Sequence, residues 1–131
     1  MRMGVLKRTR RLEKGVDASA QPHGETGLHW AAYGGHAKIV KLLLKSKAPV
    51  NVKDRRFDGT PLGWALYGWC EPAPDADKDG YYEVVKQLVS AGAAVKEEWL
   101  DESKRGMPIA RKVRKDRWMK AALKISPRFK D

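Results

Sequence analysis

The 131-residue sequence contains one cysteine, two phenylalanines and no long hydrophobic run. Cys70 cannot form a disulfide within the chain, and a lone thiol is typical of a reducing compartment, so we expect a cytoplasmic protein. The longest apolar cluster, residues 39–44, is interrupted by Lys41 and is far shorter than the roughly 18 residues that begin to suggest a membrane span. The sequence therefore predicts neither a disulfide-stabilised secreted domain nor a membrane protein.

The sequence also lacks the motifs of common enzyme classes. It has no nucleophile elbow, no phosphate-binding glycine loop and no cluster of metal ligands at suitable spacing. Asp75, Asp77 and Asp79 alternate as in a calcium loop, but the position that needs a glutamate is Lys86. We therefore predict no enzymatic activity, no cofactor and no metal site, and we interpret these acids as part of a solvated loop.

Positive charge is concentrated at the two ends of the chain. Of the net charge of +11, residues 1–14 carry +5 and residues 103–131 carry +9, whereas residues 15–102 carry −3. A basic segment attracts anionic partners such as nucleic acid, anionic lipid or an acidic protein surface. Charged ends can equally serve only to keep a small domain in solution, so charge alone does not choose between these alternatives.

Two similar units follow one another in the middle of the chain. Their first halves align at a separation of 34 residues, 24–34 with 58–68, and their second halves at a separation of 45, 39–48 with 84–93. The second unit is therefore longer by 11 residues. These fall in residues 70–80, where two prolines, four acids and a glycine predict a loop.

The run TGLHWAAYGGH at residues 26–36 resembles the core of an ankyrin repeat, with Gly27 where proline is usual. The second unit keeps the Thr-Pro-Leu of the motif at residues 60–62 but has Gly63 in place of the histidine. The resemblance implies an all-α solenoid of stacked helix-turn-helix units with short β-turn tips and helical caps. It also implies a non-enzymatic interaction module that binds a partner protein on its concave surface.

The resemblance divides the chain into four parts. Residues 1–23 are expected to form a degenerate basic half repeat or cap, residues 24–57 the first repeat, residues 58–96 the second repeat with its acidic loop at 70–80, and residues 97–131 a basic helical cap and tail. Because each repeat buries its faces only against neighbours, the two flanks have to close the stack.

Local signals support these boundaries. Thr26 and Thr60 are suited to cap the first helices through their hydroxyl groups, and Pro61 is suited to the first helical position. We expect His29 to bridge backbone groups between the repeats rather than to bind metal. We expect His36 to cap the second helix.

The ends of the second helices and the C-terminal flank are also patterned. Gly92 is suited to a left-handed helix end, where the first unit has Lys47 and should be strained. Residues 99 and 100 should pack on the second repeat. One or two helices are expected at residues 107–125, with a loose apolar stripe of Ile109, Val113, Trp118, Ala122 and Ile125.

Aromatic and arginine side chains mark the expected binding surface, since such residues anchor many interfaces. The candidate partner-binding residues are Tyr33, Arg55, Arg56, Phe57, Trp64, Tyr67 and Trp69. Trp30 aligns with Trp64 and Tyr33 with Tyr67, and Trp69 lies on the same inner helix, so these five rings can form a stacked aromatic ladder. For the two tryptophans we favour packing between helices, for the two tyrosines binding and structure are equally supported, and Trp69 can instead be covered by the inserted loop.

The partner predicted first is another protein, with an acidic surface as one option, bound by a monomer of this chain. The alternative is a nucleic-acid- or ribosome-associated accessory role that uses the basic termini. A third hypothesis, attachment to a membrane surface through the C-terminal helix, is disfavoured because the repeat stack needs that helix as its cap. Tyr81 and Tyr82 are expected to hold the inserted loop in place.

Overall fold

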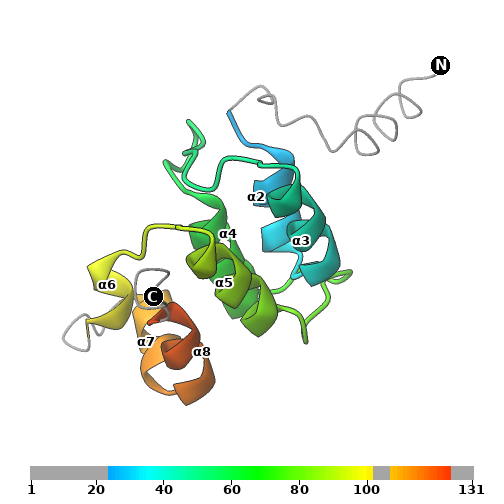
Figure 1. Cartoon of the computed structure of the whole chain (residues 1–131). Coiled ribbons are helices and arrows are strands. Elements are labelled where there is room, and N and C mark those ends of the chain that lie inside the picture. The colour runs from blue at the N-terminus through cyan, green and yellow to red at the C-terminus, as the bar shows by residue number, and fades with distance from the viewer. Residues whose placement is uncertain (1–23, 102–106, 125–131) are drawn as a thin grey trace.

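The computed structural model describes residues 24–101 and 107–124 (Figure 1), so the half repeat predicted for residues 1–23 and the tail from Ile125 onward lie outside the described residues. Within the described ranges, the regular structure is helical and contains no strand. The helices are α2 (Gly27–Tyr33), α3 (Ala37–Lys45), α4 (Pro61–Cys70), α5 (Tyr81–Ser90), α6 (Glu97–Leu100), α7 (Pro108–Arg114) and α8 (Arg117–Leu123).

The two repeats form a two-layer stack. Helix α2 pairs with α3 and α4 with α5, and the second pair lies on the first through α2 against α4 and α3 against α5 (Figure 1). The core between the layers is made of small and branched side chains such as Ala32, Val40, Leu62 and Leu66, all fully buried. The prediction of an all-α fold of stacked helix pairs is confirmed for the described residues.

The threonine caps stand where the sequence predicts them. The Thr26 hydroxyl accepts from the His29 amide, and the Thr60 hydroxyl accepts from the Gly63 amide at 3.3 Å, with Pro61 in the first turn. His36 occupies the N-cap position of α3, but its side chain makes no capping hydrogen bond. Its ring instead lies against the backbone of Gly34, so the expected capping role is wrong.

The inserted residues do not all form a loop. Helix α4 has 10 residues and α2 has 7, because α4 continues through Cys70. The remaining loop, residues 71–80, is tied to the first repeat, where the Asp77 amide donates to the Gly34 carbonyl at 2.8 Å. Since every added residue of α4 gains a helical hydrogen bond, the extension is favoured over a longer loop.

The two tyrosines after the loop have different partners. Tyr81 is buried, and its hydroxyl donates to the carbonyl of Tyr33 at the end of α2, which joins the two repeats. The Tyr82 hydroxyl donates to the carboxylate of Asp116 at the start of α8. The expectation that Tyr82 holds the loop is therefore wrong, because its ring faces the C-terminal cap.

The C-terminal cap consists of two short helices packed on the second repeat, α7 against α4 and α8 against α5. Pro108 starts α7 as expected, and Val113 and Ala122 of the predicted stripe are buried. Trp118 is an exception, with 68% of its surface exposed, while Met119 is buried in its place. Helix α8 begins after Asp116, and its orientation turns Met119 inward and leaves Trp118 outside.

The second helices of the repeats end as the sequence predicts. Both Lys47 and Gly92 have positive φ, 68° and 103°, and close the turns after α3 and α5. Because Lys47 carries a Cβ in the left-handed region, the first repeat ends with backbone strain that the second avoids. No helix in the described ranges has the length and apolar character needed to cross a membrane.

Candidate functional site

A surface pocket of about 520 Å³ lies between the inner helices and the C-terminal cap. One wall is formed by helices α2 and α4 together with the turn between the repeats, residues 55–59, which we call the tip. The other wall is formed by α6 and the start of α7. The lining residues are Trp30, Tyr33, Phe57, Gly59, Gly63, Trp64, Tyr67, Lys96, Glu98, Trp99, Met107 and Ile109. The lining is dominated by aromatic and aliphatic groups, which is typical of sites that anchor a ligand side chain.

Four aromatic rings from equivalent positions of the two repeats form one cluster. The ring centroids of Trp30 and Trp64 are 5.0 Å apart in an edge-to-face arrangement. The rings of Tyr33 and Tyr67 are stacked, with centroids 6.2 Å apart and an interplanar angle of 17°. Four of the five rings expected in the aromatic ladder therefore form it, without Trp69, and their distances lie in the favourable range for aromatic pairs.

Much of this cluster is open to solvent. Tyr67 is 53% exposed and Trp30 is 50% exposed, whereas Tyr33 and Trp64 are half-buried. The expectation that Trp30 packs between helices is wrong, because half of its surface is exposed and its ring meets Trp64 and Tyr33 in edge-to-face arrangements. Trp30 thus belongs to the pocket wall, although sequence reasoning assigned it to packing.

Phe57 and the two arginines lie at the tip between the repeats. Phe57 is 69% exposed and its ring meets Trp64 edge-on at 6.3 Å. Arg55 and Arg56 are exposed, and the guanidinium of Arg56 lies 6.0 Å from the centre of the Phe57 ring. The tip therefore extends the aromatic surface toward solvent and adds positive charge beside it.

The buried carboxylate of Asp54 holds the backbone of this tip through hydrogen bonds. Its carboxylate is 2% exposed and accepts from the amides of Phe57 at 2.7 Å and Gly59 at 2.8 Å, and from the Trp64 indole at 3.1 Å. Burial raises the pKa of Asp54, but these hydrogen bonds outweigh it and leave the pKa below its ordinary value. Asp54 was not among the residues singled out from the sequence, because a single aspartate before a turn carries no specific signal.

His29 joins the first repeat to the base of the tip. Its Nδ1 accepts from the Thr26 amide at 2.9 Å, so the neutral ring carries its proton on Nε2, which donates to the Gly59 carbonyl at 2.8 Å. Burial lowers the pKa of His29, which favours this neutral form. The predicted bridging role of His29 is confirmed.

The second wall of the pocket depends on a substitution within the repeat motif. Gly63 stands where the first repeat has His29, and the space above it is taken by the buried ring of Trp99 from α6. A Cβ at Gly63 would lie 3.6 Å from the Trp99 ring. The replacement of the repeat histidine by Gly63 is therefore the sequence feature that indicates this wall. The sequence interpretation did not include Trp99 in the site.

Trp69 does not belong to the candidate site. It is 6% exposed, its ring meets Tyr82 at 6.4 Å, and the ammonium of Lys112 lies 4.4 Å from the ring centre. Lys112 also donates to the Trp69 carbonyl at 2.8 Å. The assignment of Trp69 to partner binding is therefore corrected, since a side chain buried under the cap cannot contact a partner.

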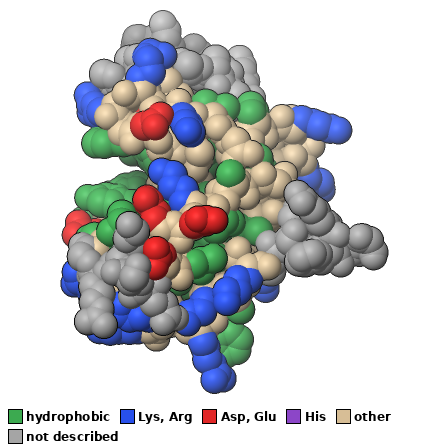
Figure 2. Space-filling model, turned by 90° about the vertical axis from the view of Figure 1, so that its left-hand side faces the viewer, with side chains coloured by type: hydrophobic (Ala, Val, Ile, Leu, Met, Phe, Trp, Pro, Cys, Tyr) green, Lys and Arg blue, Asp and Glu red, His purple; other side chains and the backbone are tan. Residues whose placement is uncertain are grey.

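The chemistry of the pocket suits binding. Figure 2 shows hydrophobic side chains between charged side chains of both signs on the face that carries the cap. Among the described residues, no group of three potential metal ligands comes together.

Cys70 lies outside the pocket lining. It is half-buried, and burial raises the pKa of its thiol, which disfavours the reactive thiolate at neutral pH.

Comparison with known families agrees with this architecture. A family model described as ankyrin repeats (3 copies) matches residues 5–98. The match covers more than two thirds of the chain. It extends into the N-terminal segment, for which the sequence pattern predicts a degenerate half repeat. Repeats of this family are generally protein–protein interaction modules and are typically non-catalytic.

Proposed function

The chain belongs to the ankyrin-repeat family, and from this premise we propose that it is a binding module that holds a partner protein in the aromatic pocket. The observation that carries the proposal is the exposure of Trp30, Phe57 and Tyr67 around one hollow. Clustered aromatic groups that remain open to solvent are the usual anchors of protein interfaces. A role as a non-enzymatic adaptor follows from the same surface.

The shape of the pocket favours a single inserted anchor. A hollow of about 520 Å³ between rigid helices accommodates one or two bulky apolar side chains, and the flanking charges bind the backbone and neighbouring residues of the same segment. Lys96 and Glu98 stand at the cap side, and Arg55 and Arg56 at the tip side. We therefore propose a partner segment with an apolar anchor and an acidic residue near the tip.

A selection that does not require a known partner tests this proposal. A library of random peptides displayed on phage is selected on the full chain, and the enriched peptides are measured by fluorescence anisotropy. We expect a consensus with a bulky apolar residue and a nearby acid. Phe57→Ala with Tyr67→Ala should weaken binding about tenfold or more, since anchor truncations commonly cost upward of about 1–2 kcal/mol.

The matched control removes exposed hydrophobic groups elsewhere. Ile39 and Leu42 of α3 are exposed to a similar degree but do not line the pocket. Ile39→Ala with Leu42→Ala should leave the affinity of the selected peptides unchanged. The proposal fails if the peptides bind the pocket variant as tightly as the unmodified chain, or if only the α3 variant loses them.

A further inference from the structure

A second surface lies on helices α7 and α8, and none of its Lys and Arg side chains lines the aromatic pocket. Residues 107–124 contain seven Lys and Arg and one acid. The cations are Arg111, Lys112, Arg114, Lys115, Arg117, Lys120 and Lys124. Lys and Arg side chains gather over the lower part of the face in Figure 2, where α7 and α8 lie.

The single acid of this surface is already engaged. The two oxygens of Asp116 accept from the Tyr82 hydroxyl and from the Met119 amide at 3.0 Å. Lys112 is also committed, because it contacts the ring and carbonyl of Trp69. Residues 107–124 contain no second acid, so with seven cations and one acid this segment carries a net charge of +6.

The exposed indole ring of Trp118 lies on the same helix as two of these cations, Arg117 and Lys120. Trp118 is 68% exposed, and the guanidinium of Arg117 lies 5.8 Å from its ring centre. Trp118, Tyr82 and Lys86 line a hollow of about 330 Å³ between α8 and α5. The hollow is large enough for a planar base to lie against the indole.

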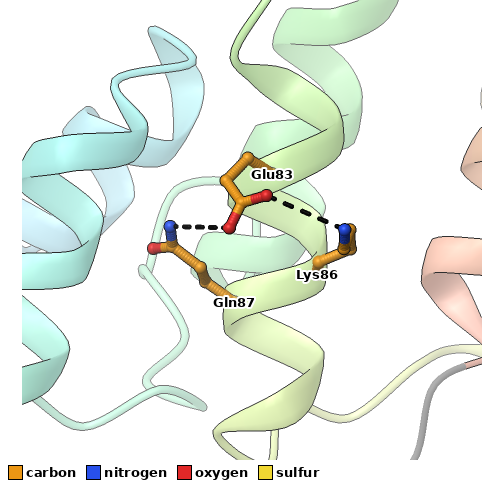
Figure 3. Close-up of polar contacts among 3 residues, drawn as sticks. All are labelled: Glu83, Lys86 and Gln87. Atoms are coloured by element: carbon orange, nitrogen blue, oxygen red, sulfur yellow. Dashed lines mark hydrogen bonds and ion pairs between the residues drawn. The ribbon is translucent and has the colours of Figure 1, made fainter.

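Lys86 can exchange its present partner for a phosphate. Its ammonium lies 3.8 Å from the carboxylate of Glu83, which also accepts from Gln87 at 3.3 Å (Figure 3). Both members of the ion pair are about half exposed. Exposed pairs of this kind contribute little stability, so a phosphate can compete with Glu83 for Lys86.

We propose that this surface binds single-stranded nucleic acid, with one base stacked on Trp118 in the hollow and the backbone phosphates along the cations of α7 and α8. Positively charged tracks with exposed aromatic rings are the common design of single-strand binding sites. A duplex does not fit the proposal, because its bases are not free to stack on a side chain.

The packing of the cap disfavours a membrane as the occupant. The apolar side chains of α7 and α8, among them Val113, Met119 and Leu123, are buried against the second repeat. A helix that lies in a bilayer interface needs a free apolar face of this kind. Trp118 is the one large hydrophobic side chain that these two helices expose within the described residues.

The direct test uses the full chain and a fluorescein-labelled 12-nucleotide RNA in an anisotropy titration, with a DNA of the same sequence as a second arm. We expect the dissociation constant to rise steeply with salt. Trp118→Ala should weaken binding about tenfold, and Trp118→Phe should retain most of the affinity because stacking is preserved. Arg111→Ala with Lys115→Ala should weaken binding and make its salt dependence shallower.

The control variants carry the same changes elsewhere. Phe57→Ala removes an equally exposed ring, and Lys41→Ala with Lys45→Ala removes two exposed charges of α3. These should leave RNA binding within about twofold of the unmodified chain. The proposal is overturned if no oligonucleotide binds at low salt, if the controls lose as much affinity as the cap variants, or if only vesicles with anionic lipid bind in a Trp118-dependent way.

Discussion

His29 of the first repeat and Gly59 at the start of the second are joined by a hydrogen bond of 2.8 Å from the imidazole Nε2 to the backbone carbonyl. On its other side the same ring accepts from the Thr26 amide, which belongs to its own helix cap. The imidazole therefore couples the start of α2 to the tip that carries Phe57. Only the neutral tautomer can make both bonds, and this gives the fold a dependence on pH.

The first prediction concerns acid. Because burial lowers the pKa of His29 in the folded chain, the unfolded chain binds a proton more readily. The contribution of the neutral His29 to the free energy of unfolding is complete above the unfolded pKa of about 6.5. This contribution is lost as the pH falls below that value, by at most about 1.4 kcal/mol per pH unit. Urea unfolding at pH 7.5 and 5.5 measures this loss. His29→Gln should be less stable at pH 7.5 and should show a smaller pH dependence; an unchanged dependence would contradict the assignment.

The second prediction concerns the buried carboxylate at the tip. Asp54→Ala leaves two amides and the Trp64 indole without their acceptor, so we expect a loss of about 2–4 kcal/mol in the free energy of unfolding. The indole N–H resonance of Trp64 should move toward the position of a solvent-exposed indole in NMR spectra. Asp58→Asn, a change of an exposed aspartate in the same turn to a residue that also tolerates its φ of 55°, serves as the control. Equal losses in the two variants would refute the role of Asp54.

The third prediction compares two glycines within α4. Gly63→Ala adds a methyl group at ordinary contact distance from Trp99, so the helix should gain about 0.5–1 kcal/mol. Gly68→Ala places the same methyl group against the Tyr33 carbonyl oxygen and should cost about 1–3 kcal/mol despite the better helix propensity. Thermal and urea unfolding measure both. A shift of the same sign in the two variants would show that the close packing of α2 on α4 does not decide the outcome.

The fourth prediction compares the two left-handed helix ends. Lys47→Gly should stabilise the chain by about 1 kcal/mol, because a side chain is strained at φ 68°. Gly92→Ala should destabilise it by a similar amount at φ 103°, although no atom lies near the added methyl group. Both substitutions are read out by urea unfolding at constant pH. Opposite signs support backbone strain as the cause, and a neutral Gly92→Ala would rule it out.

The repeat motif made the helices and their caps predictable. Thr26, Thr60 and Pro61 act within one helical turn, so their roles depend on neighbours that the sequence itself supplies. The inserted loop was located by alignment of the two units, but its first residue, Cys70, belongs to α4. The sequence did not predict which face of α8 points inward, because a loose apolar stripe does not show that the chain breaks at Asp116.

The candidate site was predictable only in its repeated part. Trp64 is equivalent to Trp30 and Tyr67 to Tyr33, and the nearness of these rings follows from the stacking of α2 on α4. Trp69 lies two residues after Tyr67 on the same helix, yet it faces the cap because two helical steps of about 100° each turn it to another face. Sequence spacing places residues on a helix face, but it does not say which face another element covers.

The sequence by itself determined the repeat, the starts of α2, α4 and α7, the left-handed turns after α3 and α5, and the excess of basic residues at both ends, because these depend on local periodicity, backbone preferences and composition. The tertiary structure alone decided that Trp99 fills the space above Gly63, that Trp69 is buried under Lys112, and that Trp118 is left exposed. These outcomes depend on how the C-terminal helices pack on α4 and α5, and contacts between residues tens of positions apart are not encoded in any local pattern.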